Sequence, residues 1–333
     1  MTKISEISEF ELIKRLEKVL EGCSLPDAAN GLLTSIGDDA AVIESPGKTQ
    51  VVTTDTMVEG VHFLPDLTST QDIGWKIMAV NYSDIASMGC DPFSSVITLG
   101  IKPNQTVEAL ENLYKGCKNL VQEFGGYIVG GDIVRSDIFF VSATVIGTSQ
   151  NQKVLMRDKA KPGDLVGVTG HLGCSAAGLN ILTQSLDTTS ESSKHFLYEH
   201  KKPSPRIYEG KFLLENGVMS AMDISDGLVS DLGKLCCASR VSAEINLSSL
   251  PVNPYLKNSH GDIWKQYALN GGEDYELIFT APQKIMDVIA ASNRYDFSVI
   301  GQVTDFGSQI TIKDENGNNF IPMSKGWDHF KSN

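Results

Sequence analysis

The sequence predicts a mixed α and β (α+β) fold in which helices and strands do not alternate regularly. Amphipathic segments with apolar residues spaced near 3.6 predict helices, and short apolar or alternating runs bounded by turn residues predict strands. Their order lacks the strict strand–helix alternation of a doubly wound parallel sheet. At 333 residues, the chain is long enough for two domains of ordinary size.

Helices and strands share the first half of the chain. Apolar residues at helical spacing predict helices at 4–20, 72–88 and 106–124. Pro46-Gly47 predicts a hairpin turn between the first two strands. The strands are expected at 40–44, 50–54, 94–101, 127–129 and 138–146.

A polar stretch around 148–153 predicts a domain boundary, which gives expected domains of 1–148 and 149–333. The turn Lys161-Pro162-Gly163-Asp164 then introduces the next strand. Further helices are expected at 174–185, 206–216, 226–239 and 282–293, and an exposed loop at 186–194. The remaining strands are expected at 165–169, 243–247, 275–280, 297–303 and 309–313.

Composition excludes several functional classes. The chain has 28 basic and 41 acidic residues, a formal net charge of −13, which argues against a nucleic-acid-binding protein. No apolar stretch approaches the roughly 20 residues that span a bilayer, and the polar start, Met1 to Leu20, is unlike a signal peptide. The six cysteines form no CxxC pair. We therefore expect a cytoplasmic protein with reduced thiols that binds neither membranes nor nucleic acid.

Carboxylates recur beside Gly, Ser or Thr where apolar runs end. An ordinary acidic surface places Glu and Lys on solvated helix faces instead. Oxygen-rich clusters of this kind suit hard cations such as Mg²⁺, which commonly accompanies phosphates. The motifs predict a magnesium-dependent enzyme acting on phosphate esters, and they are Ile36-Gly37-Asp38-Asp39-Ala40, Thr53-Thr54-Asp55-Thr56, Asn81-Tyr82-Ser83-Asp84, Gly130-Gly131-Asp132, Asp223-Ile224-Ser225-Asp226-Gly227 and Gly271-Gly272-Glu273-Asp274.

Asp84 is the most informative of these carboxylates. Its neighbours on the predicted helix face, Ile77, Val80 and Met88, are apolar, so Asp84 is expected to point toward a core. A buried carboxylate needs a partner. That partner could be a Lys or Arg elsewhere or a helix N-terminus, but a metal ion is favoured because Asp84 belongs to a set of acids.

Three of the other motifs also have a simpler structural explanation. Asp55 is expected at a strand end, where it could cap a turn, and Asp38-Asp39 could form a turn before a strand. Ser225 or Asp226 could cap the following helix, although a helix N-terminus also favours bound phosphate. Two adjacent acids repel each other, and a cation would relieve that repulsion.

Together the motifs resemble the thiamine-monophosphate kinase family, of the superfamily that includes aminoimidazole ribonucleotide synthetase and selenophosphate synthetase. The resemblance extends over nearly the whole chain, to Gly326-Trp327. Tyr82 is a mild departure from the family pattern. The most specific segments are 53–63, 79–89, Lys161-Pro162-Gly163-Asp164, Pro203-Ser204-Pro205-Arg206, Asp223–Gly227 and 271–277.

The resemblance implies ATP-dependent and Mg²⁺-dependent phosphorylation of thiamine monophosphate to thiamine diphosphate by direct in-line transfer. It also implies a two-domain fold like that of aminoimidazole ribonucleotide synthetase, with a C-terminal α/β domain that completes the active site. In this family the N-terminal sheets of two subunits join in a homodimer. ATP and thiamine monophosphate are therefore the expected small-molecule partners, with several Mg²⁺ ions as cofactors.

Site residues follow by position in the matching motifs. The implied Mg²⁺ ligands are Asp38, Thr53, Thr54, Asp55, Asp84, Asp132, Asp223 and Asp226. The implied ATP contacts are Tyr114, Gly131, Asp132, Arg157 and Ser225. The implied contacts to the thiamine moiety, where a thiazolium cation and an aminopyrimidine suit a carboxylate and an aromatic face, are His62, Glu273 and Trp327.

The implied chemistry needs no general base. The nucleophile is an oxygen of a phosphate monoester, whose second pKa is about 6, so it is already ionised near neutral pH. The difficulty lies in bringing two polyanions together in line, which requires positioning and charge neutralisation. Asp226 is expected to be the most critical side chain.

Other functions remain as alternatives. A related superfamily member could use ATP to form an amidine or selenophosphate, but Cys23 lacks the Gly-rich setting of a reactive selenophosphate synthetase cysteine. The chain also ends Phe330-Lys331-Ser332-Asn333, without the terminal Cys of the hydrogenase-maturation relative. A non-catalytic nucleotide or cation sensor is a third alternative.

Overall fold

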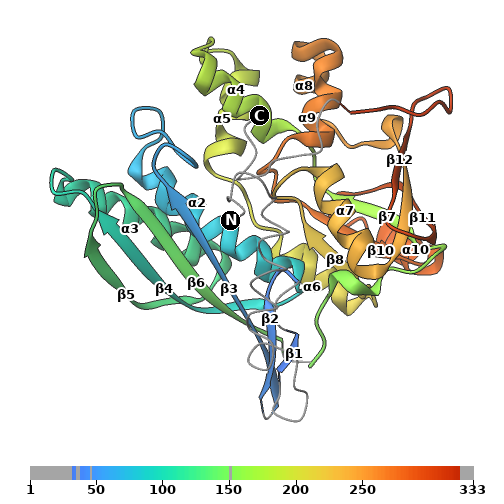
Figure 1. Ribbon diagram of the computed structural model, residues 1–333, viewed down its shortest axis with the longest axis horizontal. Helices are drawn as coiled ribbons and strands as arrows, with labels where there is room; N and C mark the ends of the chain where they lie inside the picture. Colours follow the sequence, from blue (N-terminus) through green and yellow to red (C-terminus); the bar gives the residue numbers. More distant parts are fainter. Residues whose placement is uncertain (1–31, 35–37, 46, 150–151, 323–333) are drawn as a thin grey trace, which may run out of the picture.

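The computed structural model describes residues 32–34, 38–45, 47–149 and 152–322, and Figure 1 shows two sheets with helices packed against them. Each sheet has six strands. Among the described strands, only β4 with β5 and β12 with β9 pair in parallel. The predicted mixed α and β fold is therefore confirmed, and a doubly wound parallel sheet is excluded.

The first sheet comes from the first half of the chain. Its strand order is β1 (Leu32–Thr34), β2 (Ala41–Ser45), β3 (Lys48–Val58), β6 (Phe140–Ser149), β4 (Asp91–Ile101) and β5 (Tyr127–Arg135). Side chains along β6 alternate between buried and half-buried, and Val141, Ala143 and Val145 lie on the buried face. Helices α2 (Thr70–Ser87) and α3 (Val107–Phe124) belong to the same core as that face, and among the described residues no helix covers the opposite, open face of the sheet.

Helices α2 and α3 approach each other closely at two glycines. A Cβ atom on Gly74 would lie 1.9 Å from the carbonyl oxygen of Leu113, and one on Gly116 would lie 2.0 Å from that of Gln71. Leu113, Cys117, Leu120 and Phe124 of α3 are buried in the core that the two helices share. The close approach fixes α2, which also contacts α6 and β8 in the second half of the chain.

The second sheet has the strand order β12 (Ile310–Lys313), β9 (Val241–Asn246), β11 (Phe297–Phe306), β7 (Leu165–Thr169), β10 (Leu277–Ala281) and β8 (Ser220–Asp223). One face joins the core that also contains α2, through α6 (Ile207–Glu215) and α10 (Gln283–Ser292). The other face packs against a separate core that includes α4 (Cys174–Gln184) and α7 (Leu228–Ser239). The end of β8 therefore lies close to α2, which places Asp223 beside the first half of the chain.

The structure corrects some predicted elements. The stretch 186–194 is not entirely a loop, because α5 (Glu191–Lys201) begins there at a Ser190 cap. Strands β3 and β5 extend beyond their predicted ends, and β8, α8 (Pro254–His260) and α9 (Trp264–Asn270) were not predicted. These three are short, with four to seven residues, and carry too few apolar positions to reveal a period. The helix expected at 4–20 lies outside the described residues.

Two compositional expectations can be compared with the structure. Within the described residues, no helix is long and apolar enough to cross a membrane. The five cysteines in that part of the chain are all free thiols, of which four are buried. Burial raises the pKa of the Cys90, Cys117 and Cys236 thiols to about 12.

Candidate active site

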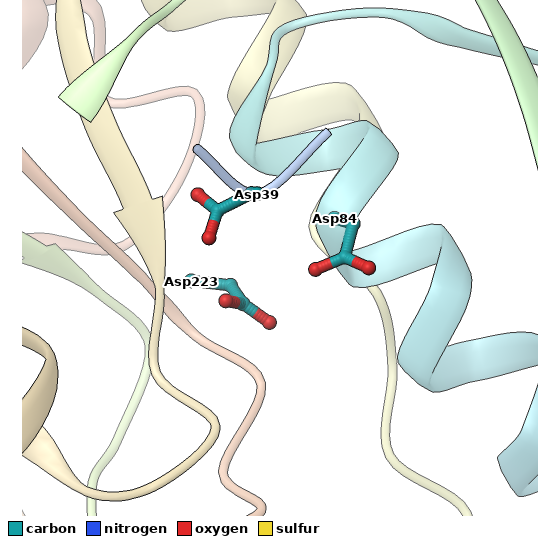
Figure 2. Close-up of side chains that lie close together, drawn as sticks. All are labelled: Asp39, Asp84 and Asp223. Atoms are coloured by element: carbon teal, nitrogen blue, oxygen red, sulfur yellow. The ribbon is translucent and has the colours of Figure 1, made fainter. Parts of the chain in front are cut away.

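Three carboxylates from distant parts of the sequence meet where the two halves of the chain join (Figure 2). Asp39 precedes β2, Asp84 is in the last turn of α2, and Asp223 ends β8. One oxygen from each carboxylate lies within 4.8 Å of the others. We call these three residues the acidic cluster. Its all-oxygen donor set matches the ligand preference of Mg²⁺.

Hydroxyl groups orient all three carboxylates. Two of the hydroxyls are on α2 itself, at positions that flank Asp84, and the third is on β3. The hydrogen bonds run from Thr53 Oγ1 to Asp84 at 2.5 Å, from Ser83 Oγ to Asp223 at 2.8 Å, and from Ser87 Oγ to Asp39 at 3.1 Å. A single helix therefore supplies one acid and fixes the two others.

The acidic cluster does not have the matched numbers of acidic and basic side chains that a structural ion-pair network has. Burial raises the pKa of Asp84 and Asp223 well above the usual range, and the neighbouring carboxylates raise both further. Among the described residues, no Lys, Arg or His forms an ion pair with either side chain. The alternative that Asp84 has a basic side chain as its partner is therefore not supported there. A bound cation would remove both the repulsion and the burial penalty.

Arg157 lies beside the cluster and binds the adjacent acids Asp38 and Asp39. Its guanidinium forms an ion pair with Asp39, and its Nε atom lies 3.4 Å from Asp38 Oδ1. Burial, and then the charge of Asp39, raise the pKa of Asp38 to about 7, although Arg157 opposes this shift. Of the two adjacent acids, Asp39 is the one in the acidic cluster, whereas the implied ligand was Asp38.

Strand β3 places its polar residues on opposite faces of the first sheet. Asp55 lies in the middle of β3. The prediction that the strand ends at Asp55, with a turn there for Asp55 to cap, is therefore wrong. Thr53 and Asp55 belong to the helix-covered face, because side chains alternate along a strand. Thr54 belongs to the open face, where its Oγ1 donates to the Ala143 carbonyl at 3.0 Å. The Thr54 hydroxyl therefore lies apart from the acidic cluster.

The turn from Ser225 to Gly227 is held by an acid that follows it. Asp231, which is fully buried in α7, accepts three backbone N–H bonds on Oδ2, from Ser225, Asp226 and Gly227, at 2.8–3.1 Å. The N-cap of α7 is Gly227 without a side-chain hydrogen bond, so the expectation that Ser225 or Asp226 caps this helix is wrong. Lys234 Nζ bridges Asp231 Oδ1 at 2.8 Å and Asp226 Oδ2 at 2.5 Å.

Removing this anchor is expected to destabilise the protein strongly. Asp231→Ala leaves three N–H groups without their acceptor and deprives Lys234 of one of its two carboxylates. We expect the free energy of unfolding to fall by about 3–5 kcal/mol, as when one partner of a buried charged pair is removed. Urea denaturation measures this change. A loss below about 1 kcal/mol, or a loss equal to that of exposed Asp262→Ala, would show that Asp231 does not hold the turn.

A cavity of about 650 Å³ opens beside the cluster. Its walls come from the middle of β3, the turn at Ser225-Asp226, helix α4, and the loop from Asn270 to Tyr275. Asp55 lines the cavity and also lies close enough to Asp84 and Asp223 to raise the pKa of both. The acidic cluster therefore adjoins a cavity large enough for small-molecule substrates.

Glu273 lies in the wall of this cavity on a strained loop. Its φ of 66° is in the left-handed region, and the Glu273 N–H donates to the Ser225 carbonyl at 2.7 Å. Gly272 allows this close approach, since a Cβ there would lie 2.7 Å from the same carbonyl oxygen. The Glu273 carboxylate forms a 2.9 Å ion pair with Lys76, and His200 Nδ1 lies 3.4 Å from the same oxygen.

His62 lines both this cavity and a smaller one of about 220 Å³. It follows β3 in a tight turn, and its Nδ1 accepts a hydrogen bond from the Val58 N–H at 3.1 Å. His62, Ser225, Asp226 and Glu273 thus lie around one space. Trp327, the third implied thiamine contact, lies outside the described residues.

Gly131 and Asp132, two further implied nucleotide contacts, are distant from the cavity. Asp132 pairs with Thr98, which pairs with Ser142, which pairs with Thr56, so three strand spacings of about 4.8 Å separate Asp132 from β3. Gly131 adjoins Asp132 on the edge strand β5. Tyr114 is half-buried on α3, and burial raises the pKa of its phenol.

Sequence patterns indicated only some of the residues that build the site. Asp39 was visible as one of two adjacent acids, but nothing distinguished it from its neighbour. Lys76 stands in an apolar helical run, which signals a buried cation in need of an acid, and Lys234 follows Asp231 at i+3 on a helix. His200 lies in a polar segment and gave no signal. The contacts of these residues cross between elements, so their partners required the fold.

Family comparisons agree with this geometry. A model of the AIR synthase related protein N-terminal domain matches residues 37–149, and a model of the corresponding C-terminal domain matches residues 161–313. Thiamine-monophosphate kinases of Bacillus subtilis and Escherichia coli K12 are 37% and 39% identical to the chain over 303 residues. Both alignments cover 89% of this chain. They cover 93% of the Bacillus subtilis protein and 91% of the Escherichia coli protein.

Solved structures show the same relationship. The structure described as AaThiL complexed with AMPPCP and TMP has a TM-score of 0.87 and 32% identity, and covers 99% of both chains. Thiamine monophosphate kinase from Aquifex aeolicus has a TM-score of 0.81 and 30% identity, with 96% of this chain and all of that chain covered. The chain belongs to the thiamine-monophosphate kinase family, within the AIR synthase related proteins.

Proposed function

We propose that this protein transfers the γ-phosphoryl group of ATP directly to thiamine monophosphate, forming thiamine diphosphate and ADP. The observation that carries the proposal is the convergence of Asp39, Asp84 and Asp223 beside a cavity lined by Asp226 and Glu273. Family membership supports the same activity, since a related structure is described as a complex with AMPPCP, an ATP analogue, and TMP.

The acidic cluster is the proposed centre of Mg²⁺ binding. Asp39, Asp84 and Asp223 would hold a first ion, while Asp55 and Asp226, which line the cavity, are proposed to extend the site toward the phosphates. Thr53 is proposed to act by orienting Asp84. When bound, Mg²⁺ supplies the charge neutralisation that lets a triphosphate and a monophosphate approach each other.

The chain itself contributes positioning. Asp231 holds the turn that carries Ser225 and Asp226, so the Asp226 carboxylate is presented to the cavity from a rigid support. Asp38 is proposed to assist by holding Arg157, whose backbone N–H donates to Asp38 Oδ2 at 3.2 Å. No side chain is assigned as a general base, because the attacking phosphate oxygen is already ionised near neutral pH.

We propose that Tyr114, Gly131 and Asp132 reach the nucleotide from a second copy of the chain. Within the described residues, the edge strand β5 has no strand partner on its outer side, and its exposed apolar side chains include Ile133, which is 65% exposed. Such an edge is a template for pairing between chains. A homodimer joined through the first sheets would bring Asp132 of one copy toward the open face of the other.

An edge substitution tests this dimer. Ile133→Asp should convert the protein to monomers, because it places a charge in an apolar interface. Sedimentation velocity measures the change. Phe306→Asp, at an exposed apolar residue of the second sheet, is the matched control and should leave the dimer intact. A wild-type monomer, or an Ile133→Asp dimer of unchanged affinity, would contradict the proposed interface.

The boundary between the two proposed domains falls after residue 148. Strand β6 of the first sheet ends at Ser149, and the first strand of the second sheet, β7, begins at Leu165. We propose that residues 1–148 carry the dimer contact and most metal ligands. Residues 149–333 would then complete the active site through Asp223, Asp226 and Glu273.

A product assay tests the function directly. The protein is incubated with ATP and Mg²⁺ alone, then with thiamine monophosphate, with an amide substrate, or with selenide. We expect ADP and thiamine diphosphate only with thiamine monophosphate. ADP with another acceptor would favour a related superfamily activity, and ATP binding without ADP formation in any mixture would favour a sensor.

A further inference from the structure

A buried ion pair between Lys76 and Glu273 lies in the cavity wall. Lys76 is on α2 with its side chain only 3% exposed, whereas the Glu273 side chain is 26% exposed and lines the cavity of about 650 Å³. The two charged atoms, Lys76 Nζ and Glu273 Oε2, are 2.9 Å apart. One partner is thus enclosed by the protein, and the other faces the space proposed for the substrate.

His200 completes this group without adding charge. Its Nδ1 atom lies 3.4 Å from Glu273 Oε2 and 3.1 Å from Ser175 Oγ. Burial, and then the charge of Lys76, lower the pKa of His200 to about 4, so the imidazole is neutral near pH 7. Lys76, with a positive charge, and Glu273, with a negative charge, therefore form a unit with no net charge at this end of the cavity.

Lys76 has no second acid among the described residues. Its ammonium also lines the smaller cavity, whose other walls include Phe63, Leu64 and Leu67. Lys201 lines the same cavity, and a buried ammonium beside apolar side chains and a second lysine is unfavourable without an acidic partner. The ion pair with Glu273 therefore fixes the position of Lys76. The positive charge of Lys76 also acts on any ligand that Glu273 binds.

The two carboxylate oxygens of Glu273 are not equivalent. Lys76 and His200 both approach Oε2. Within the described part of the chain, no hydrogen bond is donated to Oε1. Glu273 therefore keeps one acceptor oxygen for a ligand, while Lys76 balances its charge through the other.

We propose that Lys76 is a positioning residue that makes Glu273 a hydrogen-bond acceptor for an N–H donor of the substrate and prevents it from acting as a counter-ion for a cationic ring. This inference rests on the proposed function. The exocyclic amino group of the pyrimidine is the N–H donor that thiamine monophosphate offers. Glu273 would then select for that amino group, and the thiazolium charge would contribute little at this position.

Substrate analogues separate the two modes of recognition. One analogue replaces the cationic thiazolium with a neutral thiophene ring of the same shape, and a second replaces the amino group with hydrogen. For each analogue, kcat/KM is measured at saturating ATP and Mg²⁺. The kcat/KM for thiamine monophosphate is then divided by the kcat/KM for the analogue. The first quotient reports selectivity for ring charge, and the second reports selectivity for the amino group.

Comparison with the double variant Lys76→Met/Glu273→Gln, which removes both charges of the pair together, tests the wild-type state of the site. We expect amino selectivity to fall at least about tenfold in this double variant, the loss typical of a hydrogen bond to a charged group. Ring-charge selectivity should remain within about threefold of the wild type, whatever Trp327 contributes to it. A tenfold or larger fall in ring-charge selectivity with unchanged amino selectivity would overturn the inference.

Lys76→Met tests the role of the ammonium. The uncompensated Glu273 carboxylate should now attract the cationic ring, so ring-charge selectivity should rise at least about tenfold. Lys194→Met, an exposed lysine on α5, is the matched control and should leave both quotients unchanged. Unchanged ring-charge selectivity in a folded Lys76→Met protein would contradict the assigned role. If that variant does not fold, the comparison with the double variant Lys76→Met/Glu273→Gln still decides, because it leaves no unpaired charge.

The proposed function has a separate control. If wild-type protein forms no ADP with thiamine monophosphate, both the function and this inference fail. If wild-type protein turns over thiamine monophosphate but the double variant Lys76→Met/Glu273→Gln loses ring-charge selectivity, only the inference fails.

Discussion

Asp84→Asn is expected to abolish turnover and, at the same time, to stabilise the protein in the absence of divalent cations. The substitution removes one charge from three carboxylates that lie within 4.8 Å of one another. We expect kcat/KM to fall at least about 10³-fold, as for the loss of one preorganised electrostatic contact. The metal-free protein should gain about 2 kcal/mol of unfolding free energy, because repulsion in a buried site is relieved.

The stabilisation should depend on pH. The pKa of the Asp84 carboxyl is raised in the folded protein above its ordinary value of 3.8. The folded state therefore binds this proton more tightly than the unfolded chain, and wild-type stability is lost as pH rises from about 4 through the folded-state pKa. The difference in Tm between Asp84→Asn and wild type should be small near pH 4 and larger at pH 8, in the presence of a chelator.

A matched control uses the same helix. Asp72→Asn changes an acid in the first turn of α2, where Asp72 lies 3.5 Å from Lys202. That variant should keep its activity and gain no stability at pH 8. An Asp84→Asn protein that retains activity, or that is destabilised equally at both pH values in chelator, would contradict a cation site in the acidic cluster.

Asp226→Ala is expected to abolish turnover with the fold retained. The Asp226 side chain is 29% exposed and lines the cavity, so its removal leaves no void in either core. Lys234 keeps its 2.8 Å contact with Asp231, which preserves the turn. We expect kcat/KM to fall at least about 10³-fold and the unfolding free energy to change by less than about 1 kcal/mol.

Two measurements on the same protein distinguish this role from a structural one. Circular dichroism and thermal denaturation report the fold, and the product assay reports turnover. Asp262→Ala removes an exposed acid that also pairs with a lysine three residues away, and should change neither property. A loss of thermal stability in Asp226→Ala that accounts for the whole loss of activity would favour a structural role.

The long, strongly periodic elements could be predicted from the sequence. Helices α2 and α3 lie within two residues of their expected positions because their apolar faces repeat over five turns. Asp84 and Asp223 were identified because acids next to small residues at the ends of apolar runs are unusual. The expected loop over 191–194 was wrong because Glu191 and its Ser and Lys neighbours form a polar first turn of α5 behind a Ser190 cap.

The pairing of side chains across the site could not be predicted in the same way. Asp38 and Asp39 are adjacent and chemically identical, and only the fold turns Asp39 toward Asp84 and Asp38 toward Arg157. The faces of Thr53 and Thr54 depend on the extent of β3, which continues to Val58, beyond its predicted end at residue 54. The contact between Lys76 and Glu273 joins residues 197 positions apart, so no local pattern reveals it.

Anomalous diffraction from crystals grown with Mn²⁺ and a non-hydrolysable ATP analogue tests the central claim most directly. Mn²⁺ replaces Mg²⁺ at oxygen-ligand sites and gives a position for each bound ion. We predict an anomalous peak between Asp39, Asp84 and Asp223, within about 2.0–2.3 Å of their carboxylate oxygens. Peaks confined to other parts of the molecule, in crystals that bind the nucleotide, would contradict a shared ion site for these acids.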